Sequence, residues 1–366
     1  MTRASRGRRA GASPDQWAPA VTPGKSSVRN GASGNPTAVP CGLGGSERIL
    51  PPGERSADRT LHAVAVSESA ADFMAPAAAE PAEPADHEIA TISIDDRRFG
   101  IACGIDGAAQ SDPVAQSYRS GDLGPIGLLL SVARAAVRPG ARVLDLGAHI
   151  GGFACAMAAR GCRVLAVEAS PRNAALLDAS RRHNDFRDLH VEQAAVGDHE
   201  GEIRFQANGP WGQVAASEGG VRVPMTTVDA ILERHGWSEV DFVKLDVEGY
   251  EVRALRGGAR LLDGANAPPV FFESNSHTLA AFGETPESLR AEFLVRGYTV
   301  YHVRAGVLVP VRPDDRQRKV CTDYLACKRV PAGLAAWQRP SLALLSWRLK
   351  RAMDALRPRE RPPVFQ

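Results

Sequence analysis

Acidic side chains follow several short apolar runs of this chain. Asp145 stands near the end of RVLDLG, Glu168 ends RVLAVE, and Asp246 and Glu248 follow FVKL. Runs of this length and composition are typical of buried parallel strands. A parallel sheet binds its ligands beyond the carboxyl ends of its strands. The pattern therefore predicts that these acids meet at one edge of a sheet, where they could bind a cofactor or move a proton.

The loop after the first of these runs reads DLGAHIGG, residues 145–152. Gly147 permits a sharp turn, and Gly151 lets the next helix begin close to a ligand. The loop lacks the G-x-G-x-x-G pattern with which a helix N-terminus holds a pyrophosphate. The Asp145 carboxylate would repel a pyrophosphate, but it suits the cationic amino-acid end of S-adenosylmethionine. Charge therefore favours S-adenosylmethionine over NAD, and an acid that only caps the turn stays open as the structural alternative.

Two further residues belong to this predicted cofactor site. A carboxylate at the end of the second strand, here Glu168, can accept hydrogen bonds from both ribose hydroxyls. His149 is unusual because it stands between two glycines, and an imidazole ring can donate a hydrogen bond or exchange a proton. We expect it to shape the cofactor site, while a structural hydrogen bond and acid–base chemistry stay open.

Composition excludes several classes of protein. The 366 residues suffice for one large domain or two ordinary ones, and 44% hydrophobic with 23% charged residues is an ordinary globular mixture. A net charge of +2 offers no electrostatic basis for a nucleic-acid partner. No apolar run approaches the roughly 18 residues of a membrane-spanning helix. We therefore expect neither a nucleic-acid partner nor an integral membrane segment.

The cysteine spacings fit no zinc pattern, and the cysteines are too few for a disulfide scaffold. They predict free thiols in a reducing compartment, and hence a cytoplasmic protein. The six are Cys41, Cys103, Cys155, Cys162, Cys321 and Cys327.

The chain divides by composition into three parts. Residues 1–88 are rich in Arg, Pro, Ala and Glu and poor in large aliphatics, so we expect a disordered tail. Residues 89–330 have the texture of a folded domain. Residues 331–366 predict a basic amphipathic helix and tail, which would pack on its own domain or a partner, or bind a membrane surface.

Within the folded part, predicted strands and helices alternate from residue 142 onward. This alternation predicts an α/β fold with a doubly wound, mostly parallel sheet. An edge strand or hairpin is expected at 89–103, and short strands around a Gly-rich loop at 201–226. The runs GVLVPV and DYLACKR, near the end, would complete the sheet as an antiparallel pair.

Six longer stretches of the sequence carry a family resemblance: VLDLGAHIGGFACAMAARG, VLAVEASP, AAVGD, TTVDAIL, DFVKLDVEGYEVRALRGG and VFFES. In this order, and across roughly residues 115–305, they resemble the FkbM family of S-adenosylmethionine-dependent methyltransferases. The most specific of them is VDFVKLDVEGYE at 240–251. The resemblance implies a class I, Rossmann-like methyltransferase fold, S-adenosylmethionine as cofactor and, usually, O-methylation of a hydroxyl on a small molecule or glycan.

The resemblance also implies roles for single residues. Asp145 and Gly147 would shape the cofactor pocket, Glu168 would bind ribose, and Ala195, within the segment 194–196, would line the adenine. Asp246 would face both the cofactor and the methyl-transfer region, with Glu248 beside it. This chain departs from the family at His149, where the family most often has Asn.

Four residues could serve the transfer of a methyl group to a hydroxyl, which needs positioning and a base. Asp246 could orient the acceptor, and Glu248 could instead stabilise a helix start. Glu273 ends a predicted strand, and His277 lies just beyond it in SNSHT, where a solvated loop is the simpler interpretation. Lys244 could pair with a carboxylate or steer an anionic acceptor. We expect no metal ion.

Two other functions stay open at this point. An NAD-dependent oxidoreductase is disfavoured by the missing glycine pattern. A non-catalytic module would bind the cofactor without turnover. The acceptor cannot be identified from the sequence, although the loop at 201–223 and the segment before Asp122 are expected to cover it.

Overall fold

A computed structural model describes most of the chain from residue 86 to residue 338. The first strand begins at His87, two residues inside the segment expected as a tail. The rest of that segment and the expected C-terminal helix beyond residue 338 lie outside the described residues. The described ranges are 86–107, 112–206, 212–214, 220–304, 306–312 and 314–338.

In this part of the chain, eight strands form the central sheet in the order β13-β12-β14-β11-β10-β3-β4-β5. The five strands from β11 to β5 run parallel, and β14 is antiparallel to both of its neighbours. This confirms the doubly wound, mostly parallel sheet with an antiparallel last strand. The strands are β3 (Arg142–Leu146), β4 (Arg163–Glu168), β5 (Leu189–Gln193), β10 (Phe242–Leu245), β11 (Val270–Asn275), β12 (Thr299–Arg304), β13 (Val307–Pro310) and β14 (Cys321–Cys327).

The last strands differ from the expected antiparallel pair. β14 enters the sheet between β11 and β12, and β13 pairs with β12 at the edge. A short turn at Gly306, whose φ of 74° favours glycine, folds β13 back onto β12. β13 and β14 are therefore separated by β12, although both belong to the same sheet.

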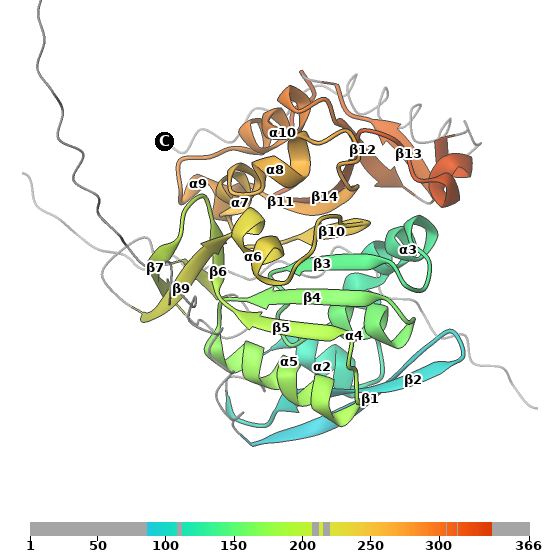
Figure 1. Cartoon of the computed structure of the whole chain (residues 1–366), viewed down its shortest axis with the longest axis vertical. Helices are drawn as coiled ribbons and strands as arrows, with labels where there is room; N and C mark the ends of the chain where they lie inside the picture. The colour runs from blue at the N-terminus through green and yellow to red at the C-terminus, as the bar shows by residue number, and fades with distance from the viewer. Residues whose placement is uncertain are drawn as a thin grey trace, which may run out of the picture. The chain divides into compact units, whose positions relative to one another are not determined.

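Helices cover both faces of the sheet (Figure 1). Residues of α3, α4 and α5 share one apolar core with one face, and residues of α6, α7, α8, α9 and α10 share a second core with the other. The run YEVRALRGGARLLDG, residues 250–264, forms two helices separated by Gly257 and Gly258, and a Cβ at Gly257 would lie 2.0 Å from the Gly197 carbonyl oxygen. The helices are α3 (Gly127–Ala136), α4 (Gly152–Ala159), α5 (Pro171–His183), α6 (Val228–Arg234), α7 (Glu251–Arg256), α8 (Ala259–Asp263), α9 (Ser276–Ala280) and α10 (Pro286–Val295).

A hairpin of β1 (His87–Ile94) and β2 (Arg97–Gly104) packs outside α4 and α5 and forms a sheet of its own. Asn184 at the end of α5 joins the two layers. Its Oδ1 accepts from the Gly100 amide at 2.7 Å, and its Nδ2 donates to the Gly100 carbonyl at 2.7 Å. Helix α2 (Pro113–Arg119) follows the hairpin and leads through the short turn η2 (Gly124–Ile126) to α3.

The run LHVEQAAVG, residues 189–197, divides between two sheets. β5 ends at Gln193, and the Ala194 amide then donates to the Glu168 carbonyl at 3.1 Å, so the chain leaves the central sheet there. The continuation, β6 (Ala195–Gly197), joins β7 (Gly201–Gln206), β8 (Gln213–Val214) and β9 (Val221–Thr227) in the order β6-β9-β7-β8. In Figure 1 this small sheet lies beside the ends to which the arrows of β4 and β5 point.

Register across the central sheet gathers polar side chains on one face. Lys244 on β10 lies beside Asp145 on β3 and Phe271 on β11. Side chains two positions apart share a face of a strand, so Asp246 and Glu273 follow on the same face at the carboxyl ends. Glu273 is in turn directly opposite Asp323 on β14. The sheet therefore presents several acids at the edge where a ligand is expected.

Candidate active site

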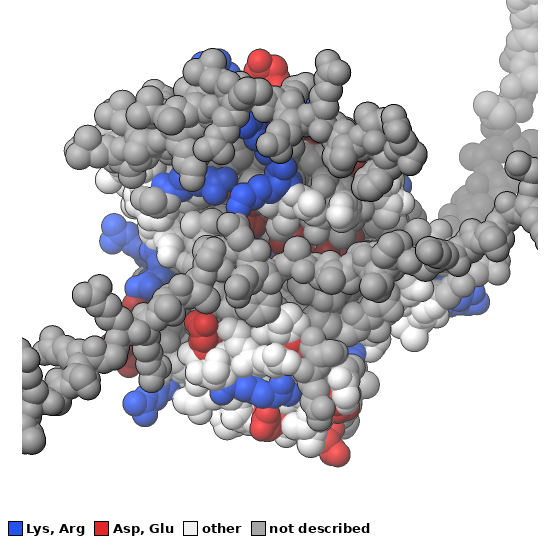
Figure 2. All heavy atoms as spheres, turned by 180° about the vertical axis from the view of Figure 1, so that it is seen from behind, with Lys and Arg blue, Asp and Glu red and all other residues white. Residues whose placement is uncertain are grey.

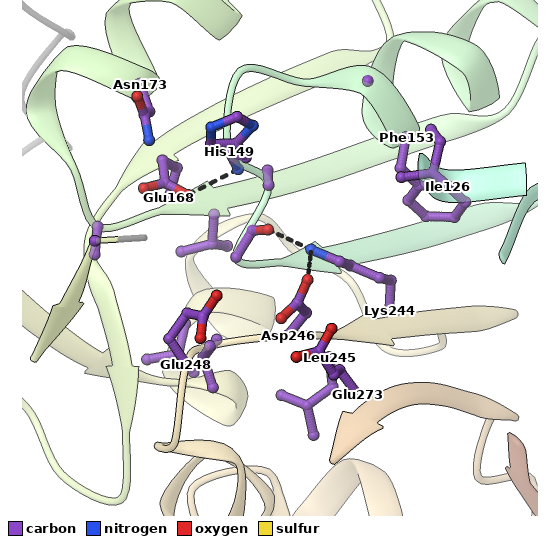
Figure 3. A pocket seen from close by; sticks show the side chains of 18 of the residues that line it. Ile126, His149, Phe153, Glu168, Asn173, Lys244, Leu245, Asp246, Glu248 and Glu273 are labelled. Carbon is purple, nitrogen blue, oxygen red and sulfur yellow. Dashed lines mark hydrogen bonds and ion pairs between the residues drawn. The ribbon is translucent and has the colours of Figure 1, made fainter. Parts of the chain in front are cut away.

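A cavity of about 320 Å³ opens at the carboxyl ends of β3, β4, β10 and β11. The loops after β3, β4 and β10 line it, together with the segment from α2 to α3. The small sheet and strands β11 and β14 complete its walls. Figure 3 shows the Asp246, Glu248 and Glu273 side chains on one side of this space, with His149 and Glu168 across from them.

The glycine loop has the tight geometry that its sequence predicts. Gly147 has a φ of 79°, and a Cβ there would lie 1.7 Å from the Asp246 carbonyl oxygen. Gly151 has a φ of 93°, and its Cβ would lie 2.2 Å from Leu177 Cδ1. Larger residues would therefore push the loop out of place at both positions. Gly147 lines the cavity, whereas Gly151 begins α4 behind it.

Glu168 organises the turns on both sides of the cavity wall. Its carboxylate accepts from the His149 amide at 2.8 Å and from the Ser170 amide at 2.9 Å, and the residue is 7% exposed. A carboxylate oxygen has more than one lone pair, so these bonds leave capacity for a ligand. Glu168 is thus at the place expected for a ribose-binding acid and holds the His149 loop to the end of β4.

The His149 side chain reaches a partner that the sequence did not indicate. Its Nε2 lies 3.2 Å from Asp112 Oδ2, and the other oxygen of Asp112 caps α2 by accepting from Val114 and Ala115. Burial alone would raise the pKa of Asp112, but the hydrogen bond and charge of His149 and the two amides lower it below its ordinary value. His149 has a φ of 52°. It therefore connects the cofactor loop to the helix that covers it.

Asp145 does not line the cavity, although a carboxylate facing the cofactor was expected there. It is fully buried, and Oδ1 lies 3.4 Å from Lys244 Nζ. Burial raises the pKa of Asp145, and Lys244 opposes that effect. Asp145 is buried because it pairs with Lys244 on the neighbouring strand β10. This pair lies within the sheet and not at the carboxyl ends of the strands, where the cavity opens.

Lys244 lines the cavity from below and connects three groups. Its Nζ donates to the Gly147 carbonyl oxygen and pairs with Asp246 (Figure 3). The distance from Nζ to the nearest carboxylate oxygen is 3.4 Å for both Asp246 and Asp145. Burial alone would lower the pKa of Lys244, but the nearby carboxylates raise it above its ordinary value. The side chain is thus a permanent cation that pairs with carboxylates, which is one of the two roles the sequence left open.

Three acids on the acceptor side hold protons more tightly than usual. Burial and then the charge of Asp246 raise the pKa of Glu248 to about 8, and they raise the pKa of Glu273 well above its ordinary value. The same two causes raise the pKa of Asp323 to about 6. Asp323 was not predicted, because only the pairing of β14 with β11 places it opposite Glu273.

Glu251 is a second acid that sequence reasoning missed. It is 3% exposed, and its Oε1 accepts from the Val247 and Gly249 amides, both at 3.1 Å. Burial raises its pKa to about 7. These bonds hold the turn in which Glu248 has a φ of 50° and Gly249 one of 100°. Glu248 therefore lies in a strained turn before α7 and not at a helix start.

His277 does not join the other predicted residues. β11 continues to Asn275, whose side chain caps α9, and His277 lies exposed in the first turn of that helix. It is not among the residues that line the cavity. The other predicted residues of the acceptor side, Asp246, Glu248 and Glu273, do line it.

The remaining wall of the cavity, near Glu168, is apolar. Ala195 lines it, as predicted, together with Phe205 and Val214 of the small sheet. Trp211 in the same segment lies outside the described residues, and Trp237 is buried in the core on the other side of the sheet. Among the described residues, no group of three His, Cys, Asp or Glu side chains has the arrangement of a metal site, and no helix has the length and apolar character to cross a membrane.

Comparison with known families identifies the domain around this cavity. Residues 145–300 match the profile of the methyltransferase FkbM domain. The chain carries an FkbM methyltransferase domain. The FkbM match runs from β3 to β12 and so includes the glycine loop, Glu168 and the acids of β10 and β11.

The cofactor of this FkbM domain is S-adenosylmethionine. The residues present fit it, because the glycine loop and several carboxyl groups line the cavity that would receive this cationic ligand. No curated relative matches the sequence.

Solved structures that resemble the chain include several methyltransferases. A precorrin-6y C5,15-methyltransferase from Geobacter metallireducens is 10% identical over 55% of this chain and 86% of its own, with a TM-score of 0.33. A TehB-like methyltransferase from Corynebacterium glutamicum is 15% identical over 60% of this chain and 99% of its own, also at 0.33. Fibrillarin from Aeropyrum pernix, with bound S-adenosyl-L-methionine, is 17% identical over 54% and 73%, at 0.31. Because these scores are low, the fold assignment rests on the strand order itself.

Proposed function

We propose that the protein transfers the methyl group of S-adenosylmethionine to a hydroxyl on a small molecule or glycan. The observation that carries this proposal is the convergence of Asp246, Glu248 and Glu273 on one cavity beside the glycine loop. A hydroxyl must lose a proton as its oxygen attacks, and carboxyl groups beside the acceptor can receive it.

We assign the cofactor to the half of the cavity between the glycine loop and the small sheet. The methionine end would lie at Gly147 and His149, the ribose at Glu168 and the adenine at Ala195. Asp145 would act indirectly, because it holds Lys244 and through it the Gly147 carbonyl. Gly151 would act through the start of α4.

Transfer would follow a direct displacement, in which the acceptor oxygen approaches the methyl group opposite the sulfur. The O–C bond forms as the C–S bond breaks, and the hydroxyl proton passes to a cavity carboxylate. Asp246, held by Lys244, would orient the acceptor. Glu248 and Glu273 have raised pKa values, so once ionised they are stronger bases than ordinary carboxylates. We therefore expect turnover to rise with pH toward about 8.

Titration of the purified chain with S-adenosylmethionine, followed by a labelled-methyl screen against cell extract, tests the proposal. Asp246→Asn and Glu273→Gln should lower turnover more than cofactor affinity. Absence of cofactor binding by folded protein would contradict the proposal. Binding without transfer to any component of the extract would instead support the non-catalytic module.

A further inference from the structure

The acceptor half of the cavity has one apolar wall. It is lined by Pro125 and Ile126 of η2, by Leu128 and Leu129 at the start of α3, and by Phe271 of the sheet. Leu128 is 37% exposed, which is high for a leucine. In Figure 3 Ile126 lies on the side of the cavity away from Glu168. This wall would remain in contact with water if the acceptor were a free sugar.

The acidic wall of the same half, formed by Glu273 and Asp323, has more carboxyl groups than cations. Glu273 and Asp323 are direct cross-strand partners, and like charges at such positions destabilise a sheet. Among the described residues neither carboxyl forms an ion pair. The more distant charge of Arg304 acts on Asp323 and the Cys321 thiol hydrogen-bonds to Glu273, whereas the charge of Lys244 is shared by Asp145 and Asp246. Figure 2 shows acidic side chains across the middle of one face of the molecule, with basic side chains above them.

We propose that the acceptor is an amphipathic molecule with an amino group, whose cationic nitrogen lies between Glu273 and Asp323. Its apolar body would pack on Ile126 and Leu128. This inference rests on the proposed function and names the substrate class of that site. A cation relieves the repulsion between two partly desolvated carboxylates, and the apolar wall supplies the area that an apolar body would cover.

The charged nitrogen also fits transfer to oxygen. An ammonium group has no free lone pair, so it cannot attack the methyl group while both carboxylates hold it as a cation. A neighbouring hydroxyl remains the nucleophile, and its proton leaves to a carboxylate as the O–C bond forms and the C–S bond breaks. The acidic wall would thus select the acceptor and protect its amine from methylation.

Three probes of equal chain length and different charge test the proposal: hexylamine, hexanol and hexanoate. Each is titrated calorimetrically at pH 7.5 into the full chain saturated with S-adenosylhomocysteine, which cannot transfer a methyl group. Hexylamine should bind at least about tenfold more tightly than the other two, a difference of about 1.4 kcal/mol. Ethylamine should bind more weakly than hexylamine, because it lacks most of the apolar body.

Variants test whether the preference for hexylamine depends on Glu273 and Asp323 or on the negative charge of any acidic residue. Glu273→Gln combined with Asp323→Asn should abolish the preference for hexylamine, while Glu239→Gln, an acid whose side chain is 71% exposed, should not. Equal binding of hexanol, tighter binding of hexanoate, or binding of none of the three would overturn the proposal. Affinity for S-adenosylmethionine is measured on every variant, so that loss of the proposed function is distinguished from loss of the amine preference.

Discussion

Lys244 is the residue on which the charges of the site depend. It is 8% exposed and lies 3.4 Å from two carboxylates, one of which has no exposed surface. A buried carboxylate without its partner must give up its charge or lose stability. Lys244 is therefore as important for placing Asp145 and Asp246 as the strands that carry them.

Replacing Lys244 by Met should lower the free energy of unfolding by about 3–5 kcal/mol, because Asp145 would stay buried without a cation. Adding Asp145→Asn to that variant should recover part of the loss. Urea unfolding followed by circular dichroism measures both. Arg222→Met, which removes a pair with both side chains largely exposed, should leave stability unchanged. An equally small effect of Lys244→Met would show that Asp145 is not charged in the folded protein.

The raised pKa values of Glu248 and Glu251 predict how stability depends on pH. For both residues the folded pKa exceeds the unfolded one, so their contribution is fully present below the unfolded pKa, near 4.5, and is lost as pH rises through about 7 to 8. Stability should therefore fall between pH 5 and pH 8. Glu251→Gln should flatten this fall by up to about 3 kcal/mol, as urea unfolding at constant ionic strength would measure. A fall equally steep in the variant would contradict the assignment.

At the scale of elements, two turns meet at the cavity and leave no space between them. The loop after β3 and the loop after β10 touch at Gly147 and Asp246, and Glu251 holds the second loop in place. His149 adds a link from the first loop to α2. The geometry of the site therefore depends on contacts between loops, and no single loop determines it.

Gly147→Ala should weaken S-adenosylmethionine binding at least about tenfold, because the new methyl group would displace the Asp246 carbonyl and with it the turn. Gly140→Ala is the matched control. Gly140 also has a positive φ, 86°, but a Cβ there meets nothing within 4 Å. Calorimetric titration of both variants compares the two effects. Similar affinities in the two variants would mean that backbone strain alone, and not the contact with Asp246, matters.

At the scale of the described fold, the hairpin of β1 and β2 is held to the central layers through polar contacts along its length, among them those of Arg97 with the Ala159 carbonyl and of Asp95 with Arg160. Asn184 supplies two of them and also donates to the Ser180 carbonyl at 2.6 Å. The Ser180 hydroxyl in turn accepts from the Ala102 amide at 2.8 Å. Helix α2 follows the hairpin in the chain and lines the cavity, so the attachment of the hairpin helps to hold one wall of the cavity in place.

Asn184→Ala should destabilise the protein by about 2–3 kcal/mol, because the Gly100 amide and carbonyl would lose their partners. Thermal unfolding and proteolysis of the hairpin measure the effect. Arg187→Ala, at a pair whose side chains are 85% and 76% exposed, should change neither. Unchanged protease resistance in Asn184→Ala would show that the remaining contacts, such as that of Arg97 with the Ala159 carbonyl, suffice to attach the hairpin.

The sequence by itself determined the local features of this protein. Apolar runs, turn residues and the glycine loop predicted most strands and helices, the parallel sheet, and the acids at its edge. These features follow from residue type and spacing, which act over a few neighbouring positions. The motif around Asp246 and Glu248 was also sufficient to indicate the family.

Only the tertiary structure decided which of these residues share a space. It placed Asp145 beneath the cavity and His277 outside it, brought in Asp112, Glu251 and Asp323, and inserted β14 between β11 and β12. Each of these outcomes depends on register and on contacts between segments far apart in the chain. Burial and neighbouring charge then decide which acids keep their protons, and both are properties of the packed structure and not of the local sequence.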